Sequence, residues 1–184
     1  KGINNHITWF NAAYAAVGAA TGSETLLRRA VEGTHGLFFQ LENSVTDDGI
    51  WYEGTMAYHF YALSAIQETL KAVESVGWDL SGNDRLKSLW MGPVQLAYPD
   101  GTFPVINDSD PGSLRGRRGY YRFALEYFGD PVFRQYAASA EATDGGEAGE
   151  PLGSSVLSGL GIAALRRSTG TDDLCAVLDY GIHG

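Results

Sequence analysis

Residues 54–76 read GTMAYHFYALSAIQETLKAVESV, and this stretch decides the fold. Its apolar side chains recur at helical spacing, but they occupy more than one face of the helix that they predict. A helix that is apolar most of the way round is buried inside a helical assembly rather than lying on its surface. The stretch therefore predicts a central helix in a layered, mainly α domain.

Helical spacing also precedes this stretch. Residues 4–20 carry apolar side chains close to a 3.6-residue period, and Gly22-Ser23 then interrupts the run. Ser23 is a plausible N-cap for a second helix, whose buried stripe would extend as far as Leu41. These two segments predict a helical hairpin ahead of the central helix.

Further helices are expected after the central one. A fourth helix is predicted from about 84 to 97, before Pro99, and a loop rich in Pro, Gly, Asp and Asn then extends to Gly112. Residues 114–128 return to helical spacing. Asp130 and Pro131 resemble an N-cap followed by proline at the first helical position, predicting a helix to about 140. Repeated helix pairs of this kind suit an (α/α) toroid.

The composition and the hydrophobic period both change near the end of the chain. Residues 146–154 lie in a stretch rich in Gly and Glu with one Pro, which is typical of a linker. Short apolar runs at 160–165 and 174–178 are then separated by polar, turn-forming residues, a pattern that predicts a β-hairpin.

Charge and composition exclude several classes of protein. The chain has 184 residues and a net charge of −9, with 22 acidic and 13 basic residues, which argues against nucleic-acid binding. No apolar run approaches the roughly 20 residues of a membrane helix. The only cysteine, Cys175, excludes an intramolecular disulfide and a cysteine-based zinc cluster. Positive charge gathers locally at Arg115, Arg117, Arg118 and Arg122, which predict either an anion-binding surface or a solvated basic patch.

Two segments carry groups that are suited to proton transfer. Residues 4–9 read NNHITW, and residues 48–61 read DGIWYEGTMAYHFY. Each segment opens a helix-patterned stretch, so folding could bring an amide, an imidazole and a phenol into one cleft. That set of groups suits proton abstraction beside a carboxylate.

Together these segments resemble the heparinase II/III-like polysaccharide lyases, a family that includes oligoalginate lyases. The resemblance extends to YPDGTFP at 98–104, NDS at 107–109 and LDYGIHG at 178–184. It implies a mainly α chain: an incomplete (α/α) toroid of helical hairpins followed by the first strands of a β-sandwich domain. The boundaries expected are 1–145 for the toroid portion, 146–154 for the linker and 155–184 for the start of the truncated sandwich. Two strands cannot form a sandwich, so they would pack on the helices, pair with another molecule or remain frayed.

The family's chemistry implies a role for three residues. These lyases cleave uronic-acid polymers by β-elimination, which removes the C5 proton and expels the oxygen at C4. The resemblance assigns Asn5 to the substrate carboxylate and His6 to the base or a second carboxylate donor. It assigns Tyr58 to the acid or, in a syn-elimination, to base and acid in turn. Tyr52 and Tyr61 stay open as alternatives to Tyr58. Capping of a helix by Asn4 or Asn5, and a core position for His6, are the structural alternatives.

Other residues near these motifs are expected to bind substrate. Trp51 is the candidate for a platform on which a sugar ring stacks. Glu53 either orients His6 or Tyr58 or forms an ordinary salt bridge. The full substrate-binding set comprises Trp51, Tyr52, Glu53, His59, Arg117 and Arg118. No metal or other cofactor is assigned to this chain. His183 begins the segment that in relatives leads to metal-binding and catalytic histidines, so a structural metal is possible in the missing β-domain.

Two other functions stay open at this point. An (α/α) glycoside hydrolase would need two carboxylates roughly 5–10 Å apart, for which Glu53 with Asp100 or Asp108 are candidates. A non-catalytic glycan-binding fragment is the third possibility. The partner expected in each case is an anionic polysaccharide or oligosaccharide, with no nucleic acid and no membrane, and the oligomeric state is left open.

Overall fold

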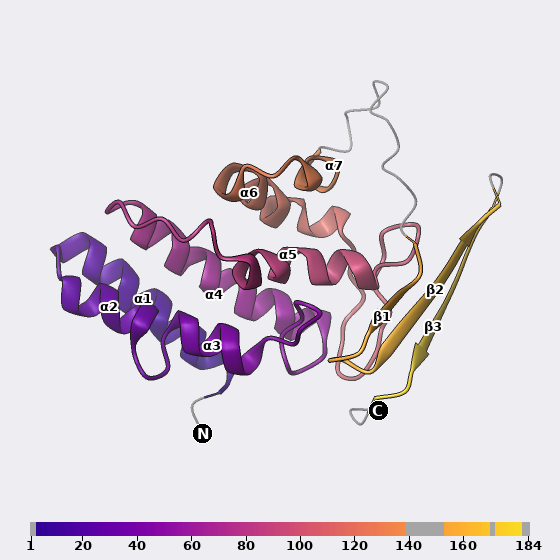
Figure 1. Cartoon of the computed structure of the whole chain (residues 1–184), viewed down its shortest axis with the longest axis horizontal. Helices are drawn as coiled ribbons and strands as arrows, with labels where there is room; N and C mark the ends of the chain where they lie inside the picture. The colour runs from indigo at the N-terminus through magenta and orange to yellow at the C-terminus, as the bar shows by residue number, and fades with distance from the viewer. Residues whose placement is uncertain (1–2, 139–152, 170–171, 182–184) are drawn as a thin grey trace.

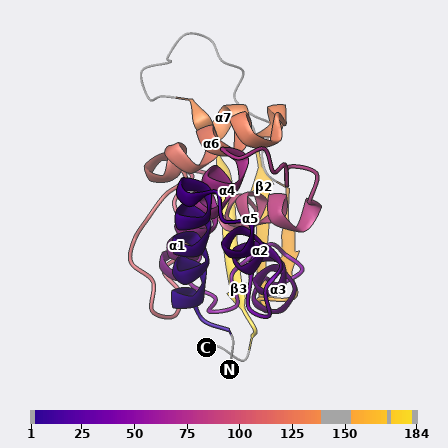
Figure 2. The same cartoon turned by 90° about the vertical axis from the view of Figure 1, so that its left-hand side faces the viewer.

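The computed structural model describes residues 3–138, 153–169 and 172–181, which form a set of helices followed by a small antiparallel sheet (Figure 1). The sheet lies at the opposite end of the long axis from α2, and Figure 2 shows α1, α2 and α3 in front of it. No helix in this part of the chain has the length and apolar character needed to cross a membrane. The elements, in chain order, are α1 (Asn5–Thr21), α2 (Glu24–Glu32), α3 (Leu37–Ser44), α4 (Met56–Glu74), α5 (Asp84–Leu96), η1 (Arg115–Arg117), α6 (Arg118–Phe128), η2 (Pro131–Phe133), α7 (Arg134–Ala137), β1 (Ser155–Leu157), β2 (Ile162–Ser168) and β3 (Asp173–Asp179).

The first two helices form the predicted hairpin. The side chain of Asn4 caps α1 by accepting a 3.0 Å hydrogen bond from the N–H of Ile7. Gly22 ends the helix with φ 69°, a left-handed conformation that glycine adopts without steric cost. The chain then reverses and α2 packs along α1.

The helix predicted to follow Ser23 as far as Leu41 is in fact two helices, α2 and α3. Gly33 and Gly36 form the break, and the N–H of Gly36 donates to the carbonyl of Gly33 at 2.8 Å. A Cβ atom on Gly36 would lie only 2.7 Å from the carbonyl oxygen of Val31, so this tight turn requires a glycine. Ser23 occupies the N-cap position of α2, but its side chain makes no capping hydrogen bond.

The central helix, α4, is buried on several faces, as its sequence predicts. Thr55 caps it, and its Oγ1 accepts a 3.1 Å hydrogen bond from the N–H of Tyr58. Most of α4 contributes to the main core, which also contains Trp51 and Trp90. Val73, near its end, belongs instead to a smaller core that α4 shares with α1 and α2. Because α4 reaches both cores, it fixes α1 relative to the rest of the molecule.

The predicted fourth helix corresponds to α5, which Asn83 caps through the N–H of Leu86 at 2.9 Å. The segment predicted at 114–128 begins as the 3-10 turn η1 and continues as α6. Asp130 caps the next segment by accepting from the N–H of Val132, but this segment opens as the 3-10 turn η2 before α7. The predicted end of that helix near 140 lies outside the described residues.

The predicted hairpin is present as β2 and β3, and β1 adds a third strand in the order β1-β2-β3, all antiparallel. The sheet packs on the helices. Ser155 donates to the carbonyl of Gln95 at 2.9 Å, and Arg166 donates to the carbonyls of Gln95 and Ala97 at 2.6 and 2.7 Å. Leu157 and Ile162 join the main core. Of the three possibilities for these strands, packing on the helices is the one observed.

The chain is therefore mainly α, with paired helices followed by antiparallel strands, which confirms the predicted fold class. The division into a toroid portion at 1–145, a linker at 146–154 and a sandwich start at 155–184 stays a prediction. Most of the expected linker lies outside the described residues.

Candidate functional site

The first turn of α1 has the features of an anion-binding helix terminus. It contains no acidic residue, and its N–H groups carry the positive end of the helix dipole. Asn4 caps the helix, so Asn5 is not the cap. Asn5 is 8% exposed, and its side-chain amide makes no hydrogen bond with any described residue. His6 is exposed rather than placed in the core.

The turn before α4 is held from inside the molecule by a buried histidine. The N–H of Trp51 donates to Nδ1 of His59 at 3.1 Å, and Nε2 of His59 lies 2.9 Å from the carbonyl oxygen of Leu89. These partners require a neutral ring with its proton on Nε2. Burial lowers the pKa of His59 to about 4, so the ring stays neutral at ordinary pH.

Trp51 and His59 are each 0% exposed, so neither ring presents a surface to a ligand in this structure. This corrects the expectation that Trp51 stacks on a sugar and that His59 contacts substrate. Their aromatic rings complete the packing between the turn and α4, as is usual for large aromatic groups. Both residues therefore act from beneath the surface by holding their neighbours in place.

One of these neighbours is Glu53, whose carboxylate accepts a 2.7 Å hydrogen bond from Nε1 of Trp51. The next contact links the second motif to the residue just before the first: the hydroxyl of Tyr52 donates to the carbonyl of Ile3 at 3.5 Å. Burial, and then the charge of Glu53, raise the pKa of Tyr52. Glu53 is thus oriented by Trp51 and faces Tyr52, and no described contact joins it to His6.

Tyr58 lies in the first turn of α4, where its hydroxyl donates a 3.2 Å hydrogen bond to Oδ2 of Asp108. The pKa of Tyr58 is raised, first by this hydrogen bond and the charge of Asp108, and then by burial and the charge of Glu53. In the sequence, Asp108 belongs to the NDS segment of the resemblance and to the carboxylate pair of a hydrolase, and neither reading links it with Tyr58. Its pairing with Tyr58 spans fifty residues of sequence, and no local pattern predicts such a contact.

A ring contact places the N-terminal halves of α1 and α4 beside each other. The rings of Trp9 on α1 and Tyr61 on α4 have centroids 5.6 Å apart. Trp9 lies about one turn beyond Asn5, and Tyr61 lies about one turn beyond Tyr58. The contact between Tyr52 and Ile3 joins the same two ends. The structure thus brings the two predicted motifs to one end of a packed helix pair.

Only one of the two predicted arginines reaches this region. The guanidinium of Arg117 lies 4.8 Å from the ring centroid of Phe60 on α4, and its charge contributes to the lowered pKa of His59. Arg118 is exposed at the start of α6 and makes no hydrogen bond, ion pair or ring contact with α4 in the described part of the chain. Within the same residues, no three His, Cys, Asp or Glu side chains are grouped closely enough to hold a metal ion, and His183 lies outside them.

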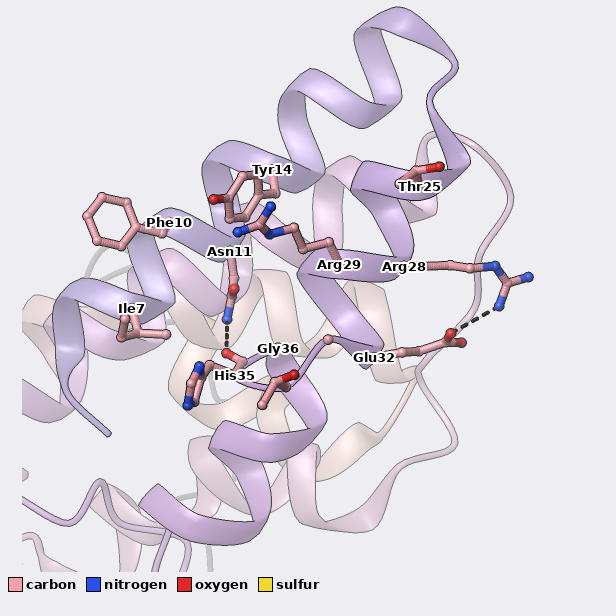
Figure 3. Close-up of a pocket in the computed structure, with 12 residues that line it drawn as sticks. Ile7, Phe10, Asn11, Tyr14, Thr25, Arg28, Arg29, Glu32, His35 and Gly36 are labelled. Atoms are coloured by element: carbon pink, nitrogen blue, oxygen red, sulfur yellow. Dashed lines mark hydrogen bonds and ion pairs between the residues drawn. The ribbon is translucent and has the colours of Figure 1, made fainter. Parts of the chain in front are cut away.

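A separate groove of about 750 Å³ lies between α1, α2 and the turn at 33–36 (Figure 3). Its floor is fixed by Asn11, whose amide donates to the carbonyl of His35 at 2.8 Å. Arg29 lies over the ring of Tyr14, 4.4 Å from its centroid. None of the predicted site residues lines this groove, although Ile7 at its edge directly follows His6. The groove is therefore distinct from the paired helix ends described above.

Comparisons with known proteins place the chain in a family. A family model described as the heparinase II/III N-terminus matches residues 28–136, more than half of the chain, whereas no curated protein sequence matches. Among solved structures, one titled heparinase III superposes with a TM-score of 0.75 at 17% identity, covering 97% of this chain and 29% of that chain. Heparan sulfate lyase HepC from Pedobacter heparinus superposes with a TM-score of 0.74 at 18% identity, covering 96% of this chain and 28% of that chain. The chain thus spans less than a third of these proteins, with which it shares the partial helical toroid and the sheet that follows it. On the strength of the family match, the chain belongs to the heparinase II/III family.

Proposed function

We propose that the intact protein is a polysaccharide lyase that cleaves a uronic-acid-containing polysaccharide or oligosaccharide by β-elimination. The observation that supports this proposal is the adjacency of the N-terminal turns of α1 and α4, indicated by the Trp9–Tyr61 ring contact one turn in and by the Tyr52–Ile3 hydrogen bond just before the two helices. One turn supplies a carboxylate-binding terminus with a free amide and an imidazole. The other supplies a phenol.

The first chemical task is to bind and neutralise the uronate carboxylate, because its charge opposes formation of a second negative charge at C5. Asn5 suits this task, since its amide is almost buried and has no partner among the described residues. The N–H groups and dipole of α1 favour an anion at the same place. Donors already in position stabilise the developing enolate without reorganisation.

The second task is proton transfer. A base removes the C5 proton, and the electron pair of that C–H bond is held with the carboxylate as an enolate. The C4=C5 double bond then forms as the C4–O4 bond breaks, and the electron pair of the broken bond leaves with the oxygen, which takes a proton from an acid. His6 is exposed beside Asn5 and is the candidate for base or for second carboxylate donor. Tyr58 is the candidate acid because its hydroxyl proton is kept in place by Asp108.

The substrate class follows from charge and from the structural neighbours. Arg117 lies against α4 and adds positive charge near the site. The neighbours are titled heparinase III and heparan sulfate lyase, so a glycosaminoglycan is the first substrate to test. Alginate and other uronate polymers present the same carboxylate and C5 proton, and they belong in the same panel.

The test uses the full-length protein with a panel of uronate polymers and oligomers. A lyase produces an unsaturated uronate whose conjugated double bond absorbs in the ultraviolet, and it incorporates no oxygen from isotopically labelled water. New reducing ends that carry label, without this absorbance, would instead show a hydrolase. Binding without any new chain ends would show a glycan-binding protein, and both of these results would overturn the proposal.

A further inference from the structure

We propose that Asp108 is a positioning residue that aims the Tyr58 hydroxyl and keeps it in its proton-carrying form, so that Tyr58 serves as the acid of the elimination and not as its base. This inference rests on the proposed function, because it assigns one direction of proton transfer to a residue of that site. It starts from the hydrogen bond of 3.2 Å between the phenol and the carboxylate.

The loop that carries Asp108 is fixed at its base. Thr102 pairs with Ser113 in an antiparallel bridge, and the N–H of Phe103 donates to the carbonyl of Gly112 at 2.9 Å. The side chains of Phe103 and Pro104 are buried beneath it. Residues 102–113 therefore form a closed loop that leaves the helices and returns at a defined place.

The tip of this loop is attached to the start of α4. Oγ of Ser109 accepts a 3.2 Å hydrogen bond from the N–H of Met56, one of the first-turn groups that lack a partner within the helix. Asn107 adopts a left-handed conformation with φ 52°, and its amide lies near Gly54. Asp108 is held between these two contacts, so its carboxylate reaches Tyr58 from a braced backbone.

Charge then decides the protonation state of the phenol. Among the described residues, the charges that raise the pKa of Tyr58 belong to Asp108 on the loop and Glu53 in the turn before α4. Other titratable groups on the described elements around this turn include Tyr52 in the turn, His6 on α1, Tyr61 and the buried neutral His59 on α4, Asp110 on the loop and Arg117 in η1. A phenolate at this position would face two carboxylates, whereas a neutral phenol donates to one of them.

The direction of proton transfer follows from this arrangement. A base must be deprotonated before it removes the C5 proton, and the two carboxylates oppose that state of Tyr58. An acid must carry its proton until O4 departs, and the same two carboxylates favour that state. The departing alkoxide is a stronger base than the phenolate that it leaves behind, so it still takes the proton. Tyr58 then regains a proton from water, and removal of the C5 proton falls to another group.

The experiment measures the pH profile of kcat/KM in the full-length protein with the uronate polymer that it cleaves. Asp108→Asn keeps an oxygen acceptor but removes the charge, and we expect the alkaline limb to move to lower pH. Asp108→Glu should return the alkaline limb to its wild-type pH, because it restores the charge. Asp108→Ala also loses the acceptor, so it should lower kcat roughly tenfold or more through misplacement of the phenol. Asp110→Asn is the matched control in the same loop and should leave the profile unchanged. An unmoved limb in Asp108→Asn would overturn the inference.

A second readout separates this inference from the proposed function. The ultraviolet difference absorbance of tyrosinate, compared between the wild type and Tyr58→Phe, isolates the titration of Tyr58 without substrate. We expect this titration to move to lower pH in Asp108→Asn and to stay in place in Asp110→Asn. A protein that shows the shift but no lyase product would refute the proposed function alone. A Tyr58 titration that is identical in the wild type and Asp108→Asn would refute the coupling itself, whatever the activity.

Discussion

The N–H of Trp51 donates a 3.1 Å hydrogen bond to Nδ1 of His59, which uses its opposite ring nitrogen to donate to the carbonyl of Leu89. One buried imidazole thus joins the turn before α4, α4 itself and α5. The ring satisfies a backbone donor and a backbone acceptor at once, which only the neutral ring can do in this orientation. Tyr52 and Glu53 directly follow Trp51 in this turn, so the geometry of the candidate site depends on a buried histidine.

The buried histidine makes folding stability depend on pH. In the unfolded chain His59 takes up a proton below its ordinary pKa of 6.5, but in the folded state it does so only below about 4. The unfolded state therefore binds more protons between these values, and the free energy of unfolding falls as the pH is lowered from 6.5 to 4. The full effect is on the order of 3 kcal/mol. Urea unfolding measured across this range should show the decline.

Two variants show whether His59 is the source of this pH dependence. His59→Gln has no titrating ring, so the decline between pH 6.5 and 4 should become shallower, and the variant should be less stable at neutral pH. His35→Gln changes an exposed imidazole and should retain the decline. An equally steep decline in His59→Gln would assign the effect to other groups.

Two glycines in helices are expected to respond to alanine in opposite directions. At Gly92 in α5, a Cβ would lie 2.6 Å from the carbonyl oxygen of Gly49 and 2.7 Å from Cδ1 of Ile50, so Gly92→Ala should destabilise the fold by about 1–3 kcal/mol. At Gly119 in α6, a Cβ would have no described atom from outside its own helical turn within 4 Å, and Gly119→Ala should stabilise the fold by about 0.4–1 kcal/mol. Thermal and urea unfolding would check both signs, and a neutral Gly92→Ala would show that α5 lies farther from the turn.

The carboxylate of Asp48 attaches the sheet to the turn before α4. Its Oδ2 accepts hydrogen bonds from the N–H groups of Gly159 and Leu160 at 2.7 and 3.2 Å. Asp48→Ala should therefore cost about 1–3 kcal/mol and speed hydrogen exchange at the Leu160 amide. The adjacent Asp47 has a side chain that is 93% exposed, and Asp47→Ala should change stability by less than about 0.5 kcal/mol. Equal effects of the two substitutions would contradict this attachment.

Asn5 and Asn11 are both nearly buried, on one helix, but only one has a structural partner. The amide of Asn11 donates to the carbonyl of His35, so Asn11→Ala should cost about 1 kcal/mol of stability. Asn5 has no side-chain partner among the described residues, so Asn5→Ala should change stability by less than about 0.5 kcal/mol. If Asn5 binds the substrate carboxylate, the same change should lower kcat/KM of the full-length protein about 100-fold or more. Unfolding and turnover, measured on both variants, would test this separation of roles.

The fold could be predicted where hydrophobic content reports burial directly. The apolar residues of α4 lie on several faces, and the helix is buried on those faces. The break between α2 and α3 was missed because Leu37 and Leu41 continue the apolar spacing across it. Gly33 and Gly36, two glycines three residues apart, were the available signal. The attachment of the sheet to α5 depends on Arg166 reaching main-chain carbonyls some seventy residues away, which periodicity cannot show.

The residue types of the candidate site could be predicted from the sequence, but the burial and tertiary contacts of these residues were harder to predict. Asn5, His6 and Tyr58 stand out because an amide, an imidazole and a phenol suit the chemistry, and their two helices pack together. The interior positions of Trp51 and His59 are set by tertiary packing that motif spacing does not encode. Asp108 was missed as the partner of Tyr58 because the contact is made through a loop whose closure depends on Thr102 and Ser113.

The most direct test of the account compares Tyr58→Phe with Tyr61→Phe in the full-length protein. Tyr61 lies about one turn farther along α4, is 43% exposed and packs against Trp9 with the rings tilted, so it serves as the matched phenol. The measurement is the rate of unsaturated uronate formation, with thermal unfolding as the control for folding. We predict that Tyr58→Phe loses about 100-fold or more of turnover with unchanged folding, and that Tyr61→Phe retains most of it. Turnover close to wild type in Tyr58→Phe would contradict the account and direct attention to Tyr52 or Tyr61 as the proton donor.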